Sequence, residues 1–166
     1  MYLTLISTAV LACHLALISW IDFRRHTIPN LLNLSLACSG LAFSVAGQDR
    51  ALLNVLLAVG LTAVIFLFLG LIYKALRKRR GFGGGDIKFL AAAAAWTGLL
   101  GVPWIVLIAS ISGLAFAIFA SLHGRAMKAD TRIAFGPHLS LGLLISWLLR
   151  DVIAGHVCWK IHHEKP

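Results

Sequence analysis

The stretch 51-ALLNVLLAVGLTAVIFLFLGLIY-73 decides the fold, because it places 23 residues in a row without one charged side chain. A helix needs about 20 apolar residues to cross a hydrocarbon core of about 30 Å. Similar runs recur along the 166-residue chain, which is 60% hydrophobic, and charge collects in short clusters between them. A soluble domain interleaves its apolar residues with charge instead. The sequence therefore predicts an all-α membrane protein.

Charged, glycine-rich or proline-containing breaks separate six candidate transmembrane helices. The first is expected to be a retained span, since it lacks the basic leader of a signal peptide and is longer than a typical signal-peptide core. The apolar tail 152–161 is expected either to span or to lie at the interface. The expected architecture is a polytopic bundle of about six helices, one domain over residues 1–166 with no separate soluble domain. The predicted spans are Leu3–Ile21, Leu31–Gly47, Ala51–Tyr73, Asp86–Val102, Pro103–Leu122 and Phe135–Leu149.

Lysine and arginine are distributed unevenly between the two sides of these spans. The loops after the first, third and fifth spans hold eleven of them, and the other side holds four. Cytoplasmic loops carry the excess of positive charge, so these three loops are expected in the cytoplasm and both termini outside. The net charge of +9 is therefore explained by membrane topology, and no nucleic-acid partner is expected. The cluster 77-RKRR-80 is expected to face anionic lipid.

Two of the six acidic residues lie against apolar helix at the same expected membrane depth. Asp22 ends the first span, and Asp86 begins the fourth, 64 residues later. Each also has a structural explanation. Asp86 could cap the N-terminus of its helix, and Asp22 could be neutralised by Arg24 or Arg25. Acidic groups near the bilayer are costly, however, and indicate function where a partner acid can be named.

Two carboxyl groups in a partly desolvated site can perform a particular reaction. They share a single proton, because two like charges close together disfavour double ionisation. The ionised group draws a proton from a water molecule while the protonated group polarises a carbonyl, as in aspartic proteases. Glycines 83–85 are expected to adopt positive φ and to leave room for an extended peptide. A simple flexible linker is the alternative for this glycine run.

Three motifs carry a resemblance to the prepilin peptidases, the type IV leader peptidase family of G-x-G-D membrane aspartic proteases. They are 83-GGGD-86 continued by Ile87-Lys88, the stretch 22-DFRRHTIPN-30, and the stretch 135-FGPHLSLG-142. The resemblance implies a bacterial inner-membrane endopeptidase that removes the short leader of type IV pilin-like precursors at the cytoplasmic face, without metal or cofactor. Asp22 and Asp86 are the implied catalytic pair. The residues implied to bind substrate or shape the site are Pro29, Asn30, Gly83, Gly85, Lys88, Gly136 and Pro137.

The resemblance extends to a short, peptidase-only form of the family that serves tight-adherence (Flp-type) pili. Larger bifunctional members carry paired CxxC motifs and also methylate the new N-terminus, whereas the three cysteines here are scattered without a CxxC pair. Methyltransferase activity is therefore not expected. The implied partners are a prepilin or pseudopilin precursor and the lipid bilayer, with the oligomeric state left open.

Two other functions fit the same residues. His26, His123 and His138 are expected on the cytoplasmic side near both aspartates, and imidazole with carboxylate can ligate a metal, although no H-x-x-x-H spacing supports such a site. The aspartates could also form a proton relay in a membrane assembly subunit or a proton-coupled transporter component. Peptide cleavage that resists chelators and requires both aspartates would distinguish the protease from both alternatives.

Overall fold

The computed structural model describes residues 2–46, 51–77, 83–123 and 134–149. Within these ranges all regular secondary structure is α-helical, which confirms the expected all-α class. The tail 152–161 and most of the basic cluster 77–80 lie outside the described residues. The helices are α1 (Tyr2–Arg25), α2 (Asn30–Ala46), α3 (Leu52–Arg77), α4 (Gly84–Thr97), α5 (Gly101–Leu122) and α6 (Gly136–Leu148).

The helices differ in whether they can cross a membrane by themselves. Among the described residues, α1, α3 and α5 are long and apolar enough to do so. α2 has 17 residues, α4 has 14 and α6 has 13. At 1.5 Å per residue, α4 and α6 are only about 20 Å long, shorter than a hydrocarbon core of about 30 Å. The six predicted helices are all present, but three of them are shorter than full spans.

The turn between the fourth and fifth helices lies earlier than the sequence analysis placed it. α4 ends at Thr97, and Gly98 follows with φ 74° and ψ 177°, a backbone conformation that favours glycine and cannot continue a helix. The fourth span was expected to end at Val102 and the fifth to begin at Pro103, but residues 101–103 form the first turn of α5. Pro103 is tolerated there because the first N–H groups of a helix have no partner within the helix.

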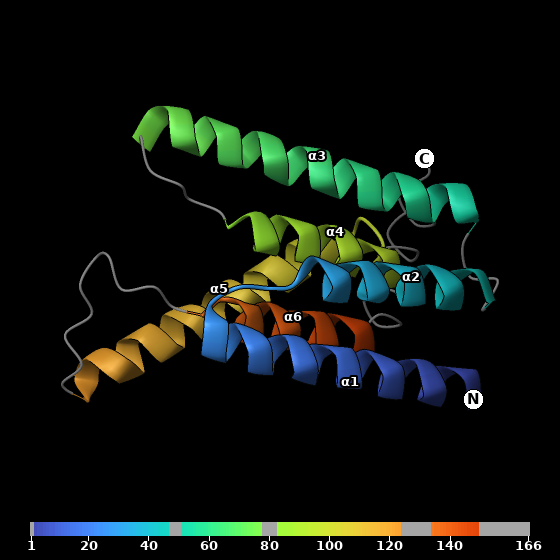
Figure 1. The fold of residues 1–166 in the computed structure, drawn as a ribbon, viewed down its shortest axis with the longest axis horizontal. Coiled ribbons are helices and arrows are strands. Elements are labelled where there is room, and N and C mark those ends of the chain that lie inside the picture. Colours follow the sequence, from blue (N-terminus) through green and yellow to red (C-terminus); the bar gives the residue numbers. More distant parts are fainter. Residues whose placement is uncertain (1, 47–50, 78–82, 124–133, 150–166) are drawn as a thin grey trace, which may run out of the picture.

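α4 lies at the centre of the bundle (Figure 1). It packs against α2, α3, α5 and α6, while α6 also packs against α1 and α5. Its interior position explains its alanine-rich sequence, because small side chains allow neighbouring helices to approach from several sides. The residues of α4 that are buried are Phe89, Leu90, Ala92, Ala93, Ala94, Ala95, Trp96 and Thr97.

Trp96 fastens α4 to α2. Its indole N–H donates to the backbone carbonyl of Leu36 at 2.8 Å, and the hydroxyl of Ser44 donates to the carbonyl of Ala95 at 2.7 Å. A Cβ on Gly40 would lie 2.6 Å from the Trp96 ring, so the indole occupies the space that a side chain would fill. This seam fixes the rotation of α4 about its axis, and therefore the direction in which its first turn faces.

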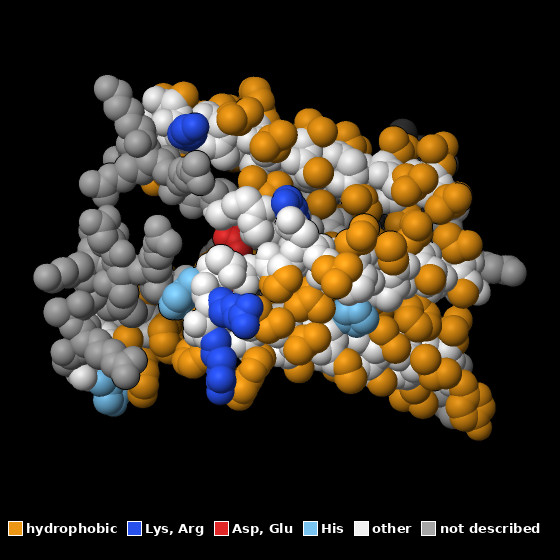
Figure 2. Space-filling model, viewed as in Figure 1, with side chains coloured by type: hydrophobic (Ala, Val, Ile, Leu, Met, Phe, Trp, Pro, Cys, Tyr) orange, Lys and Arg blue, Asp and Glu red, His pale blue; other side chains and the backbone are white. Residues whose placement is uncertain are grey.

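The outer surface is largely apolar. Figure 2 shows hydrophobic side chains over most of the face in view, while the visible lysine, arginine and acidic side chains lie in one half of the molecule. Every lysine and arginine within the described residues belongs to the C-terminal part of α1 or α3 or to the first turns of α4. These are the ends predicted to face the cytoplasm.

Candidate active site

Asp22 lies in the last turns of α1 and is directed at the beginning of α6. It is 5% exposed, and its Oδ2 accepts a hydrogen bond of 2.8 Å from the backbone N–H of Gly136. The N-terminus of a helix carries partial positive charge, so it is a favourable place for a carboxylate. Arg24, one of the two arginines that could have neutralised Asp22, instead places its guanidinium 4.4 Å from the centroid of the Trp20 ring.

Gly136 has to be a glycine for this contact. A Cβ at this position would lie 2.6 Å from Oδ2 of Asp22 and 2.8 Å from both its Cβ and its Cγ. Pro137 follows in the first turn of α6, where its missing N–H leaves no hydrogen bond unmade. The F-G-P motif therefore forms the contact surface for Asp22. Gly136 leaves space for the carboxylate and donates its N–H to it, and Pro137 lies in the first turn of the helix that faces it.

Asp86 lies in the first turn of α4, where it is half-buried. It is the third residue of the helix rather than its N-cap, a position that Gly83 occupies. Its carboxylate is directed back toward Gly83: a Cβ on that glycine would lie 2.9 Å from Oδ2 of Asp86. The absence of a side chain at residue 83 therefore leaves the space that the carboxylate uses.

The structure brings the two aspartates together although 64 residues separate them. Their carboxylates are near enough for their charges to interact. Asp22 comes from the C-terminal end of α1 and Asp86 from the N-terminal end of α4. In Figure 2 the acidic surface, drawn in red, lies close to lysine and arginine side chains, drawn in blue. Two carboxyls whose charges interact are the arrangement that aspartic proteases use for general acid and base catalysis at a carbonyl.

The glycines before Asp86 do not adopt the conformation that the sequence analysis expected. Gly83 has φ −67° and ψ 136°, an extended conformation open to any residue. Among the described glycines only Gly98 has positive φ. The expectation of positive φ in glycines 83–85 is therefore wrong, because Gly84 and Gly85 already form the first turn of α4. The requirement at Gly83 is for space beside the carboxylate, not for an unusual backbone.

The connection between α1 and α2 packs over the start of α4. Ile28 is buried, and a Cβ on Gly85 would be 3.5 Å from its Cβ, an ordinary van der Waals contact. Pro29 precedes α2, and its carbonyl accepts from the backbone N–H groups of residues 32 and 33. Beside it, Nζ of Lys88 donates to Oδ1 of Asn30 at 2.8 Å. The I-P-N and G-x-G-D motifs thus meet in space.

Asn33 belongs to the same region, and the sequence analysis did not single it out. It is 5% exposed and donates from Nδ2 to the carbonyl of Gly85 at 3.5 Å. The signal that could have found it is its place in α2, one turn after Asn30, on a helix otherwise made of small and apolar residues. A polar amide inside a membrane helix indicates a specific contact.

The three histidines considered as metal ligands make other contacts or lie at the surface. Nδ1 of His138 lies 3.1 Å from the hydroxyl of Ser112, and its ring packs against two phenylalanines. Nδ1 of His123 lies 2.9 Å from the carbonyl of Phe119, and His26 is exposed at the end of α1. Within the described part of the chain, no group of three histidine, cysteine, aspartate or glutamate side chains is arranged to hold a metal.

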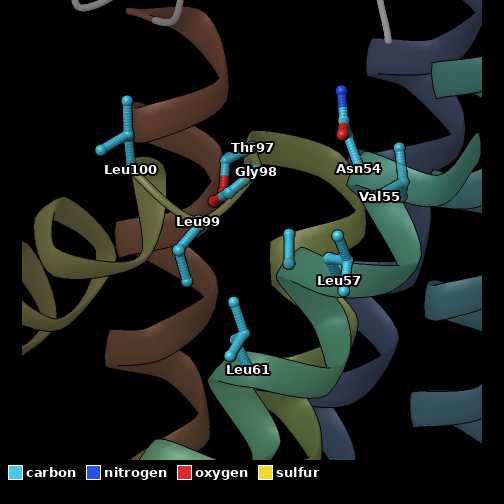
Figure 3. Close-up of a pocket in the computed structure, with 9 residues that line it drawn as sticks. Asn54, Val55, Leu57, Leu61, Thr97, Gly98, Leu99 and Leu100 are labelled. Carbon is cyan, nitrogen blue, oxygen red and sulfur yellow. The ribbon is translucent and has the colours of Figure 1, made fainter. Parts of the chain in front are cut away.

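A separate cavity of about 300 Å³ lies at the opposite end of α3 and α4 from the aspartates (Figure 3). Leucines from α3 and from the turn before α5 face one another across it, and no titratable side chain lines it. It therefore lacks the groups for hydrolysis. Its lining residues are Asn54, Val55, Leu57, Ala58, Leu61, Thr97, Gly98, Leu99 and Leu100.

Comparison with known proteins connects this geometry to a family. Residues 9–118 match the model of the type IV leader peptidase family, a range that contains both aspartates. The chain belongs to the type IV leader peptidase family. Its third motif, around Gly136, lies outside the matched range but supplies the hydrogen bond to Asp22.

Curated relatives agree with this membership. The chain is 34% identical over 151 residues to the prepilin leader peptidase/N-methyltransferase of Escherichia coli K12, covering 89% of this chain and 61% of the relative. It is 38% identical over 136 residues to the protein of the same name from Dickeya chrysanthemi, covering 77% and 46%. The chain thus spans about half the length of these relatives. No solved structure matches it.

Proposed function

We propose that this chain is a membrane-embedded aspartic endopeptidase that removes the short leader peptide from type IV prepilin precursors. The observation that carries the proposal is the meeting of Asp22 and Asp86, each held at a helix N-terminus, in a chain of the leader peptidase family. Prepilin cleavage is named in the relatives from Escherichia coli and Dickeya chrysanthemi. Flp-type precursors are the proposed substrates within this class, and the bacterial inner membrane is the proposed location.

In the proposed reaction, the two carboxyls share one proton. The ionised carboxylate removes a proton from a water molecule, whose oxygen forms a bond to the scissile carbonyl carbon. The protonated carboxyl hydrogen-bonds to the carbonyl oxygen and stabilises the negative charge that develops there. Collapse of the tetrahedral intermediate breaks the C–N bond, and the leaving nitrogen receives a proton from the dyad. The products are the leader, with a new carboxyl group, and the mature chain, with a new amino group.

The distribution of charge supports a cytoplasmic position for this reaction. Within the described residues, every lysine and arginine lies at the end of the molecule that holds the aspartates. Cytoplasmic ends of membrane proteins are enriched in these residues. The precursor is therefore proposed to present its leader from the cytoplasm while its apolar segment stays in the bilayer.

Co-expression with a type IV prepilin precursor, followed by mass analysis of the precursor's N-terminus, tests the proposal. We expect the wild-type chain to remove the leader in the presence of a chelator. Asp22→Asn and Asp86→Asn should each insert normally and leave the precursor intact, because an amide of nearly the same shape cannot share the proton of the dyad. Normal cleavage by either variant would contradict the aspartic mechanism, and cleavage abolished by chelation would favour a metal centre.

A further inference from the structure

Asn33 has an unusual balance of hydrogen bonds for a buried side chain. Its Nδ2 has a partner, the carbonyl of Gly85, whereas its Oδ1 is buried with no partner among the described residues. An unpaired buried acceptor destabilises a protein, and an apolar side chain of the same shape avoids that loss. Stability alone would therefore favour leucine at this position, which indicates that the amide serves another purpose.

The partner of Asn33 indicates what that purpose is. The carbonyl of Gly85 belongs to the peptide group that joins Gly85 to Asp86, so a hydrogen bond to it holds the peptide plane from which the second aspartate extends. The same plane is held on its other side by the Asp86 N–H, which donates to the carbonyl of Gly83 at 3.1 Å. Ile28 lies beside Gly85, so that a Cβ on the glycine would be in van der Waals contact with it. Among the described side chains, Asn33 therefore supplies the directional contact to this peptide.

We propose that Asn33 is a positioning residue that acts through the Gly85–Asp86 peptide, setting the orientation of the Asp86 carboxylate relative to Asp22. This inference rests on the proposed peptidase function. Asn33 does not need to touch the substrate for this role. Its removal should slow the chemical step and leave substrate binding nearly unchanged, because a misplacement of about 1 Å in a reacting group can cost up to about a hundredfold in rate.

Steady-state kinetics of the purified full chain with a synthetic prepilin precursor peptide test the inference. Asn33→Leu should lower kcat by about tenfold or more, with KM close to the wild-type value. Its thermal unfolding temperature should be equal to or higher than that of the wild type, because the unpaired oxygen is gone. Asn54→Leu is the matched control, since it makes the same change at an exposed asparagine at the other end of the bundle, and it should leave kcat unchanged.

A second pair keeps the inference testable if Asn33→Leu does not insert. Asn33→Gln and Asn33→Met have similar lengths and differ in the amide, so Gln should keep a clearly higher kcat than Met at equal unfolding temperature. Equal kcat values for this pair, or a wild-type kcat in Asn33→Leu, would overturn the positioning role while leaving the peptidase function intact. Absence of cleavage by the wild-type chain in the same assay would overturn both.

Discussion

At the scale of single residues, the candidate site depends on two glycines as much as on the two aspartates. Asp22 and Asp86 each extend into space that a neighbouring glycine leaves free, at residues 136 and 83 respectively. The two glycines differ in what a methyl group would meet. At residue 136 it would meet the Cβ of Asp22, which the backbone fixes, whereas at residue 83 it would meet only the end of a side chain.

Gly136→Ala should therefore damage both stability and activity. The added methyl group can be accommodated only if α6 moves away from α1, and overpacking of this kind costs about 1–3 kcal/mol. The movement also removes the hydrogen bond from the Gly136 N–H to Asp22. Thermal unfolding in detergent and cleavage of a precursor peptide would both report the change. An unchanged unfolding temperature together with full activity would show that the helices are not in such close contact.

Gly83→Ala should instead affect catalysis with little loss of stability. The new Cβ would push Oδ2 of Asp86 aside, and displacement of a reacting group by about 1 Å costs up to about a hundredfold in kcat. Gly84→Ala is the matched control, because nothing lies within 4 Å of a Cβ at residue 84. Kinetics on the two purified variants would check this, and equal kcat values would mean that the glycine run is only a linker.

At the scale of helices, the position of the second aspartate depends on the seam between α2 and α4. Trp96 is the residue before the last of α4, and its indole fills the space above Gly40 and donates its N–H to α2. The other end of the same helix carries Asp86. A rotation of α4 at one end would turn the carboxylate at the other, so packing at the Trp96 end supports the geometry of Asp86.

Gly40→Ala should destabilise the protein by about 1–3 kcal/mol, because the methyl group would displace the Trp96 ring and break its hydrogen bond to Leu36. Gly60→Ala is a suitable comparison. No atom lies within 4 Å of a Cβ at residue 60 in α3, so the change should be neutral or stabilise by up to about 1 kcal/mol through helix propensity. Chemical or thermal unfolding of both variants in detergent would check the difference. If both variants unfold alike, the seam does not hold the helix.

Much of this arrangement of helices could be predicted from the sequence, because hydropathy and charge report directly on the membrane. The order of the six helices, the ends that carry basic residues and the convergence of the two aspartates all follow from them. The positions at which helices end are harder to predict from the sequence. The expected boundary between the fourth and fifth spans, at Val102 and Pro103, lies too late, since the apolar run gives no indication that Gly98 stops the helix.

The contacts within the site could not be predicted in the same way. That Asp22 accepts from the Gly136 N–H depends on how α1 and α6 pack, and no periodicity in the sequence encodes that contact. For the same reason the contact of Asn33 could not be predicted, because an asparagine in an apolar helix gives no indication of a partner 52 residues away. The glycine motif is evident in the sequence, but its physical role, space rather than backbone freedom, depends on where the Asp86 carboxylate lies.

At the scale of the whole molecule, the two ends of the bundle should face different compartments. In a variant with its native cysteines replaced, a cysteine at the exposed Thr27, between α1 and α2, should react with an impermeant thiol reagent from the cytoplasm. A cysteine at Leu100, 65% exposed in the α4–α5 turn, should react from the outside. Labelling of intact cells and of inverted vesicles would compare them. If both cysteines react from one side, the expected topology is wrong.

The shortness of α6 has a consequence for the surrounding lipid, because its Leu141 and Leu148 are exposed. A helix of about 20 Å is mismatched with a bilayer whose hydrocarbon core is about 30 Å thick, and membranes adapt to short helices by thinning locally. Since α6 begins beside Asp22, a dimple in the leaflet on that side would let bulk water reach the dyad without a channel through the protein. Lipids with shorter acyl chains would favour such a dimple, so the composition of the host membrane would itself set how readily the site is hydrated.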